Sequence, residues 1–152
     1  MKKAKNYFLC ALAFAMMFAL CSCSTFLSYS FNVETGDKIK VTLDTSSGLS
    51  LEQKDGVFSV KKDDEVILQG MFINEDTYNQ YVKIKGQQGM TVLADTEKDG
   101  NTYYMYEVDG QTGTEDNFVV WLKNSNTGVI LGSVAGKDNA KEAFEKLTLE
   151  KE

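Results

Sequence analysis

Short stretches in which apolar and polar residues alternate, separated by turn residues, constrain the fold of this chain more than any other feature. Residues 39–43 and 57–61 are two such stretches. Alternation with a period of two is typical of a β-strand that buries one of its faces. Because the sequence contains no proline, glycine, asparagine and aspartate have to form the turns. The pattern therefore predicts consecutive strands linked by tight turns.

Two Asp-Gly pairs indicate where the chain reverses direction. Asp55-Gly56 and Asp99-Gly100 each separate two alternating runs. An Asp-Gly pair between such runs is a strong signal for a two-residue β-hairpin. Residues 110–116 are polar and are predicted to form a loop. The predicted strands are residues 39–43, 49–53, 57–61, 66–73, 90–95, 102–108, 118–122 and 128–134.

Two segments carry helical signals instead. Asn74 precedes two acidic residues, and Gly86 follows a lysine-containing stretch, which predicts a mid-chain helix capped by Asn74. Apolar residues recur at helical spacing over residues 139–147, which predicts a second helix with Asp138 as its N-cap.

The order of these elements predicts the fold class. We expect an α+β domain: an antiparallel β-sheet of about seven strands, with one mid-chain helix and one C-terminal helix packed on it. By its length, the segment 38–152 is expected to form a single domain.

The first 22 residues are predicted to be a signal peptide. Lysines precede an uncharged apolar run at residues 8–20, which is short for a membrane-spanning helix. The ending Leu-Cys-Ser-Cys at residues 20–23 resembles the lipobox of bacterial lipoproteins. The resemblance implies that Cys23 is acylated and that cleavage occurs just before it. It also implies a lipid-anchored protein on the extracytoplasmic face of the cell membrane.

Two alternatives to this interpretation remain open: an ordinary secretory signal with incidental cysteines, or an uncleaved N-terminal membrane helix. If Cys23 is the anchor, residues 23–37 are expected to be a lipidated N-terminus and short tether that lead into the domain.

Composition argues against several classes of function. The chain carries 16 basic and 22 acidic residues, and three of its lysines lie in the predicted leader, so nucleic acid is not an expected partner. There is no histidine and no arginine. Cys23 is the one cysteine that follows the predicted leader, and its thiol would carry the lipid. We therefore expect no cofactor, no histidine- or thiolate-bound metal, and no enzyme activity.

Four aromatic residues are the strongest candidates for ligand binding. Tyr103, Tyr104, Tyr106 and Trp121 lie on two predicted strands. Because both strands place apolar groups on both faces, the first interpretation is a central strand pair covered on both sides. The alternative is an exposed aromatic surface that binds a glycan or a peptide.

Acidic residues at two turns were considered as metal or catalytic sites. Asp95, Glu97 and Asp99 have the spacing of the start of a calcium loop, but Tyr106 stands where that loop needs a bidentate glutamate. A charged hairpin turn is the simpler interpretation, with weak calcium binding as the alternative. The acids at residues 63–65 are neighbours in one turn, which does not supply two carboxylates facing each other across a cleft.

Hairpin strands, a middle helix, further strands and a terminal amphipathic helix follow one another, with Thr-Gly-Val-Ile-Leu at residues 127–131 before that helix. This order resembles that of PsbP-like lipoproteins of unknown role, although the early proline-containing start of that family is missing. The resemblance brings no catalytic residues. We expect a non-catalytic binding or interaction module for an envelope protein, a peptide or a glycan. The alternatives are a structural or stress-response envelope component without a small ligand, or a carboxylate-dependent glycan-acting enzyme.

Overall fold

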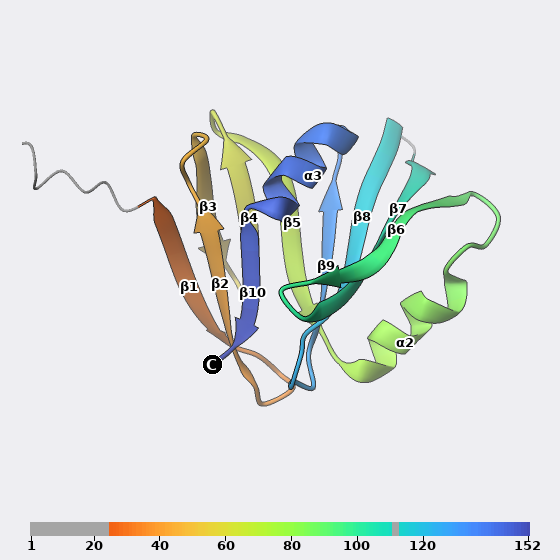
Figure 1. Ribbon diagram of the computed structural model, residues 1–152, viewed down its shortest axis with the longest axis horizontal. Helices are drawn as coiled ribbons and strands as arrows, with labels where there is room; N and C mark the ends of the chain where they lie inside the picture. Colours follow the sequence, from red (N-terminus) through yellow and green to blue (C-terminus); the bar gives the residue numbers. More distant parts are fainter. Residues whose placement is uncertain (1–24, 111–112) are drawn as a thin grey trace, which may run out of the picture.

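Ten strands and two helices make up the computed structural model, which describes residues 25–110 and 113–152 (Figure 1). The elements are β1 (Phe26–Asn32), β2 (Lys38–Asp44), β3 (Leu49–Lys54), β4 (Val57–Lys62), β5 (Glu65–Ile73), α2 (Glu75–Ile84), β6 (Met90–Lys98), β7 (Asn101–Gly110), β8 (Gly113–Trp121), β9 (Gly128–Ser133), α3 (Lys137–Glu145) and β10 (Leu147–Lys151).

The strands form two antiparallel sheets. The larger sheet has seven strands in the order β3-β4-β5-β9-β8-β7-β6, and the smaller one has the order β1-β2-β10. The predicted fold class is confirmed: the fold is α+β, with a seven-stranded antiparallel sheet, a mid-chain helix and a C-terminal helix. The three-stranded sheet is an addition that the sequence analysis did not predict.

The main core lies between the seven-stranded sheet and a layer made of the three-stranded sheet and α3, which stands in front of it in Figure 1. Phe58, Phe118 and Leu131 of the larger sheet are buried there, as are Val41 of β2 and Phe144 of α3. We call this face of the seven-stranded sheet the inner face and the opposite one the outer face. Alternation along β7 places Tyr103 and Met105 on the inner face, and Tyr104 and Tyr106 on the outer face.

Both Asp-Gly hairpins form as predicted. Asp55 and Gly56 have φ angles of 52° and 79°, and Asp99 and Gly100 have φ angles of 55° and 82°. Two-residue turns of this kind need positive φ at both central positions, which aspartate tolerates and glycine adopts without strain. The two turns join β3 to β4 and β6 to β7.

The mid-chain helix is also confirmed, but the predicted ends of the C-terminal helix are wrong. Asn74 caps α2, because its side-chain oxygen accepts a hydrogen bond of 2.9 Å from the Thr77 amide. Helix α3 follows Gly136 and has no side-chain cap, so Asp138 lies in its first turn rather than at its N-cap. Leu147 begins strand β10, because Leu147 and Leu149 alternate with polar residues and pair with β2.

Two segments expected to be irregular belong to the sheets. Phe26–Asn32, inside the predicted tether, is strand β1 and pairs with β2 over its full length. The folded domain therefore starts before residue 38, because Tyr29 and Phe31 alternate with polar residues and turn toward the core. Most of the predicted loop at residues 110–116 belongs to β7 and β8. Residues 1–22 and Cys23 lie outside the described residues.

Candidate functional site

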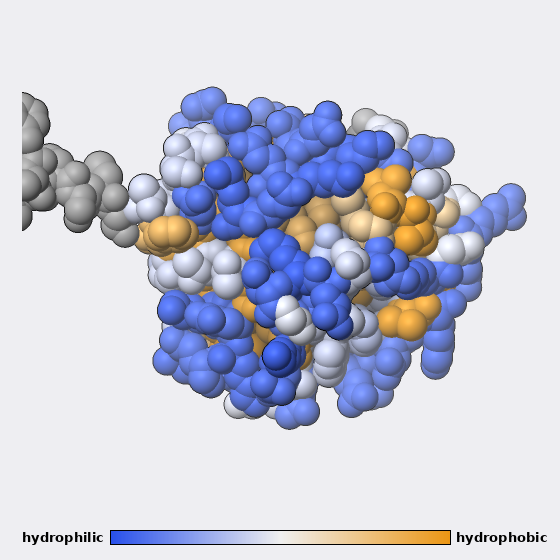
Figure 2. Space-filling model, in the orientation of Figure 1, coloured by the Kyte–Doolittle hydropathy of each residue, from blue (hydrophilic) through white to orange (hydrophobic). Residues whose placement is uncertain are grey.

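The outer face of the seven-stranded sheet has two halves that differ in cover. Side chains of α2 pack on the outer face of β7 and β8, which we call the closed half. The open half comprises the outer face of β4, β5 and β9 with the adjoining side chains of β8, and a groove lies there. On the side of the molecule that carries α3, mostly hydrophilic side chains form the surface (Figure 2).

The closed half buries the tyrosines that the sequence had suggested as ligand contacts. Tyr104 is 2% exposed, and it stacks on Tyr106 with 5.6 Å between ring centroids. The Tyr104 hydroxyl donates a hydrogen bond of 2.8 Å to the backbone carbonyl of Tyr81 in α2. Burial, followed by the charge of nearby Tyr81, raises the pKa of Tyr106 to about 12. Burial also raises the pKa of Tyr104. Both residues are therefore neutral packing groups.

The other two aromatic candidates lie apart from each other. Tyr103 is on the inner face, and its ring centroid lies 4.9 Å from that of Phe144 in α3. Trp121 is half-buried on the outer face, 4.8 Å from the ring of Tyr78 in α2. The four aromatic residues therefore do not share one exposed surface. Their placement fits the interpretation of a strand pair covered on both sides.

The candidate calcium ligands lie along the β6–β7 hairpin. Asp95 forms an ion pair with Lys85, and Asp99 forms one with Lys98 at 2.8 Å. In the part of the chain that the structure describes, no three acidic or cysteine side chains are placed to hold a metal ion. The acidic turn at residues 63–65 is exposed, and Asp63 and Asp64 have positive φ angles. The geometry supports the hairpin-turn interpretation of both segments.

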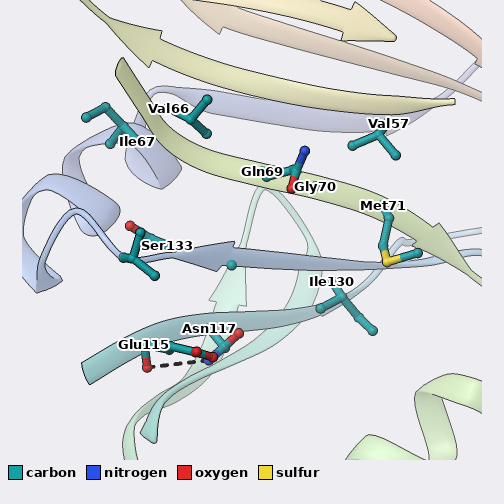
Figure 3. Close-up of a pocket in the computed structure, with 12 residues that line it drawn as sticks. Val57, Val66, Ile67, Gln69, Gly70, Met71, Glu115, Asn117, Ile130 and Ser133 are labelled. Carbon is teal, nitrogen blue, oxygen red and sulfur yellow. Dashed lines mark hydrogen bonds between the residues drawn. The ribbon is translucent and has the colours of Figure 1, made fainter. Parts of the chain in front are cut away.

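The groove of the open half has a volume of about 470 Å³ (Figure 3). Two rows of side chains cross its floor. In the first row, Gln69 of β5 and Asn117 of β8 stand on either side of Gly132 of β9, which pairs with both. In the second row, Met71 of β5 lies beside Ile130 of β9. The floor therefore offers a pair of amides next to an aliphatic strip.

Because Gly132 has no side chain, the space between the Gln69 and Asn117 amides stays open. A Cβ atom at this position would stand 3.4 Å from the Asn117 side-chain oxygen. The Asn117 amide donates only a long hydrogen bond of 3.4 Å, to the backbone carbonyl of Glu115 (dashed in Figure 3). Met71 is 51% exposed, which is high for a methionine in a strand of the sheet interior. Met71 and the Asn117 amide therefore make few contacts with the rest of the described chain.

A second cavity of about 630 Å³ lies next to the groove at one end of the sheet, and we call it the end cavity. Val57 and Met71 line both spaces. The walls of the end cavity come from the β1–β2 turn, the β3–β4 turn, the end of β5 and the start of α2. The groove and the end cavity are thus neighbours that meet at Val57 and Met71.

A buried carboxylate holds the β1–β2 turn that lines the end cavity. Asp37 accepts hydrogen bonds from the Asn126 amide at 2.7 Å and the Thr127 hydroxyl at 2.9 Å. Its other oxygen pairs with Lys151 at 2.6 Å. The hydrogen bond from Lys151 is the main cause that lowers the pKa of Asp37, with further lowering by Asn126 and Thr127. This network ties the turn to the β8–β9 connection and to β10.

The groove residues were missed by the sequence analysis. Glycine, valine, glutamine and methionine in a strand are ordinary sheet residues, and no spacing signal separates them from their neighbours. One signal was present: residues 128–134 place Gly, Ile, Gly and Val at alternate positions, a face that is too small to fill a core layer.

Comparisons with known proteins leave the fold and the groove as the main guides to function. No protein-family model matches the chain, and no curated protein matches it. The resemblances to lipoproteins and to PsbP-like proteins therefore stay predictions. Over the residues that the structure covers, no helix is both long enough and apolar enough to cross a membrane.

Proposed function

We propose that this protein is a lipid-anchored, extracytoplasmic binding module that holds an extended polypeptide segment in the groove of the open half. The observation that supports this proposal is that a polar row of side chains lies next to an apolar row on the groove floor. Gln69 and Asn117 offer side-chain amides that can hydrogen-bond to a peptide backbone, and Met71 and Ile130 offer an apolar contact for its side chains.

A polypeptide suits this floor better than a glycan. Sugar rings are bound by stacking on tyrosine or tryptophan, and no aromatic side chain is among the described residues that line the groove. Non-catalytic binding also fits the lining, in which Glu115 is the one acidic residue and no lysine is present among the residues described. The carboxylate-dependent cleavage of glycans needs two such groups facing each other across the substrate.

The proposed anchor brings the domain close to the membrane. Strand β1 starts at Phe26, three positions after Cys23, so an acyl group on Cys23 leaves a very short connection to the sheet. We expect Cys23→Ser to abolish acylation and to move the protein out of the membrane fraction. Membrane attachment and electrophoretic mobility that do not change in this variant would contradict the anchor.

Peptide binding can be tested by selection from a display library of random peptides of about ten residues, which span the groove when extended. The full chain in detergent serves as the target. We expect peptides with apolar side chains at alternate positions to be enriched, because alternate residues of an extended peptide face the same side. Binding of a selected peptide is then measured by fluorescence anisotropy.

Two groove variants and one matched control sharpen the test. Gly132→Val fills the space between Gln69 and Asn117, and Met71→Glu places a charge on the aliphatic strip. Each is expected to weaken binding about tenfold or more. Val82→Glu changes an apolar side chain of α2 that is 42% exposed but lies outside the groove, so it should bind normally. A library that yields no binder, or binders that tolerate both groove variants, contradicts the proposal and favours a component without such a ligand.

A further inference from the structure

The end cavity differs from the groove in its charge. Glu34 of the β1–β2 turn and Asp55 of the β3–β4 turn both line it, and no lysine is among its described lining residues. Both acids are exposed. Neither forms an ion pair with a lysine described by the structure. Two uncompensated negative charges therefore stand at one cavity.

The end cavity also has apolar lining. Phe31 and Phe72 stand with their ring centroids 5.0 Å apart, and Val33, Val57, Met71 and Ile73 line the cavity with them, beside the polar side chains of Asn32, Thr35, Asn74 and Thr77. A lysine or arginine side chain matches both features of the cavity, because its apolar stem can pack on the apolar lining while its charged tip contacts the carboxylates. A neutral apolar side chain would satisfy the walls but would leave the two acids unpaired.

The end of β5 shows how an extended segment can reach this cavity. Strand β5 pairs with β9 as far as Ile73, whereas its pairing with β4 stops at Gly70. Among the described residues, no strand pairs with Phe72 and Ile73 on the β4 side, and this edge adjoins the end cavity. An extended peptide is the natural partner for a free strand edge, because its backbone can continue the ladder of hydrogen bonds.

We infer that the peptide bound by this protein is basic, with a lysine or arginine side chain seated in the end cavity between Glu34 and Asp55. This inference rests on the proposed function and names the partner class for it. The aliphatic residues of the same peptide lie along the groove on Met71 and Ile130. The charge contact directs the peptide so that its basic residue lies at the β3–β4 turn.

The same display selection tests the inference when it is run on two further variants. Glu34→Gln combined with Asp55→Asn removes both charges at the cavity, and asparagine tolerates the positive φ of position 55. Asp63→Asn combined with Asp64→Asn removes two charges at an exposed turn outside both cavities, at positions that also have positive φ. The wild-type chain and this control should enrich lysine or arginine at one fixed position.

The cavity variant should lose that enrichment, and it should bind the best basic peptide about tenfold more weakly than the wild type. Replacing the basic residue of that peptide with glutamine should reduce wild-type binding to a similar extent and should make it insensitive to salt. Selected peptides that are neutral would overturn the inference but leave the proposed function in place. A basic preference that persists in the cavity variant would also overturn it, and a selection without any binder would overturn the proposed function itself.

Discussion

The two halves of the outer sheet face share the same sheet but serve different purposes. On the closed half, the rings of Tyr104 and Tyr106 fill the space between β7 and α2. On the open half, Gly132, Ile130 and Met71 leave a groove without cover. The difference shows that the large aromatic residues of this chain mark where the sheet is covered, and that small and flexible residues mark where it is open.

Helix α2 explains why the closed half needs such large side chains. None of the residues of α2 is fully buried, so the buried part of the contact comes from the side chains of the sheet. Tyr78 and Tyr81 pack on the sheet, and the Tyr104 hydroxyl bonds to the helix backbone. The tyrosines of β7 therefore hold the helix in place, whereas no helix in the described part of the chain packs on the open half.

The largest effect on stability is expected from Tyr104→Ala in the closed half. Removing a buried ring leaves a cavity beneath α2 and should lower the free energy of unfolding by about 3–4 kcal/mol. Tyr104→Phe keeps the ring and loses only the bond to Tyr81, so it should cost about 1 kcal/mol. Urea denaturation followed by circular dichroism measures both values.

The matched substitution in the open half is Met71→Ala. Because this side chain is half exposed on the same outer face, its loss should change the free energy of unfolding by about 0.5 kcal/mol or less. A cost for Met71→Ala that approaches the cost for Tyr104→Ala would remove the contrast between the two halves.

An intermediate effect is expected from Asp37→Asn, which loosens the turn at the end of the open half. The loss of the charged contacts to Lys151 and Thr127 should cost about 2 kcal/mol at neutral pH. Since the folded pKa of Asp37 lies below its ordinary value of 3.8, this stabilisation is present above that pH and is lost as the pH falls. The gap between wild type and variant should therefore shrink in acid-unfolding measurements below pH 3.8. A gap that stays constant with pH would contradict the role of the charge.

An effect of the opposite sign, a gain in stability, is expected at Asp116, on the inner face of β8 and opposite Ser133 of β9. One of its carboxylate oxygens is buried without a hydrogen-bond partner among the described residues. Burial, followed by the negative charge of Glu107, raises the pKa of Asp116. The inner face of β8 therefore carries a destabilising charge.

Asp116→Asn should accordingly raise the free energy of unfolding by about 1 kcal/mol at neutral pH. Because the folded pKa lies above 3.8, the charge costs nothing below that value, and its cost grows as the pH rises through the folded pKa. Thermal unfolding across this pH range should show the two proteins equal in acid and separated at neutral pH. An Asp116→Asn protein that is less stable than wild type at neutral pH would show that the carboxylate has a stabilising partner.

Local patterns allowed much of the fold to be predicted. The Asp-Gly turns and the Asn74 cap are local devices, because a few adjacent residues determine their backbone angles and hydrogen bonds. Strands β1 and β10 were harder to predict because each is short and becomes stable only by pairing with β2, which lies elsewhere in the sequence. For this reason the predicted C-terminal helix extended to Leu147, although Leu147 is the first residue of strand β10.

The candidate site was predicted less well than the fold. Tyr103, Tyr104, Tyr106 and Trp121 were identified correctly as residues of two apolar strands, but the sequence could not show which faces are covered. The groove lies on a part of the outer face that α2 does not line, and the position of α2 is set by its packing on β7 and β8, which follow it in the chain.

The sequence by itself determined the alternating strands, the turns between them and the capped middle helix. It also determined that no histidine is available as a base or a metal ligand. Each of these depends on residue type or on neighbours a few positions away. Only the tertiary structure decided which half of the sheet stays open and that Glu34 and Asp55 meet at one cavity. Those properties depend on contacts between segments that are far apart in the chain, because burial is a property of the packed molecule and not of any single stretch.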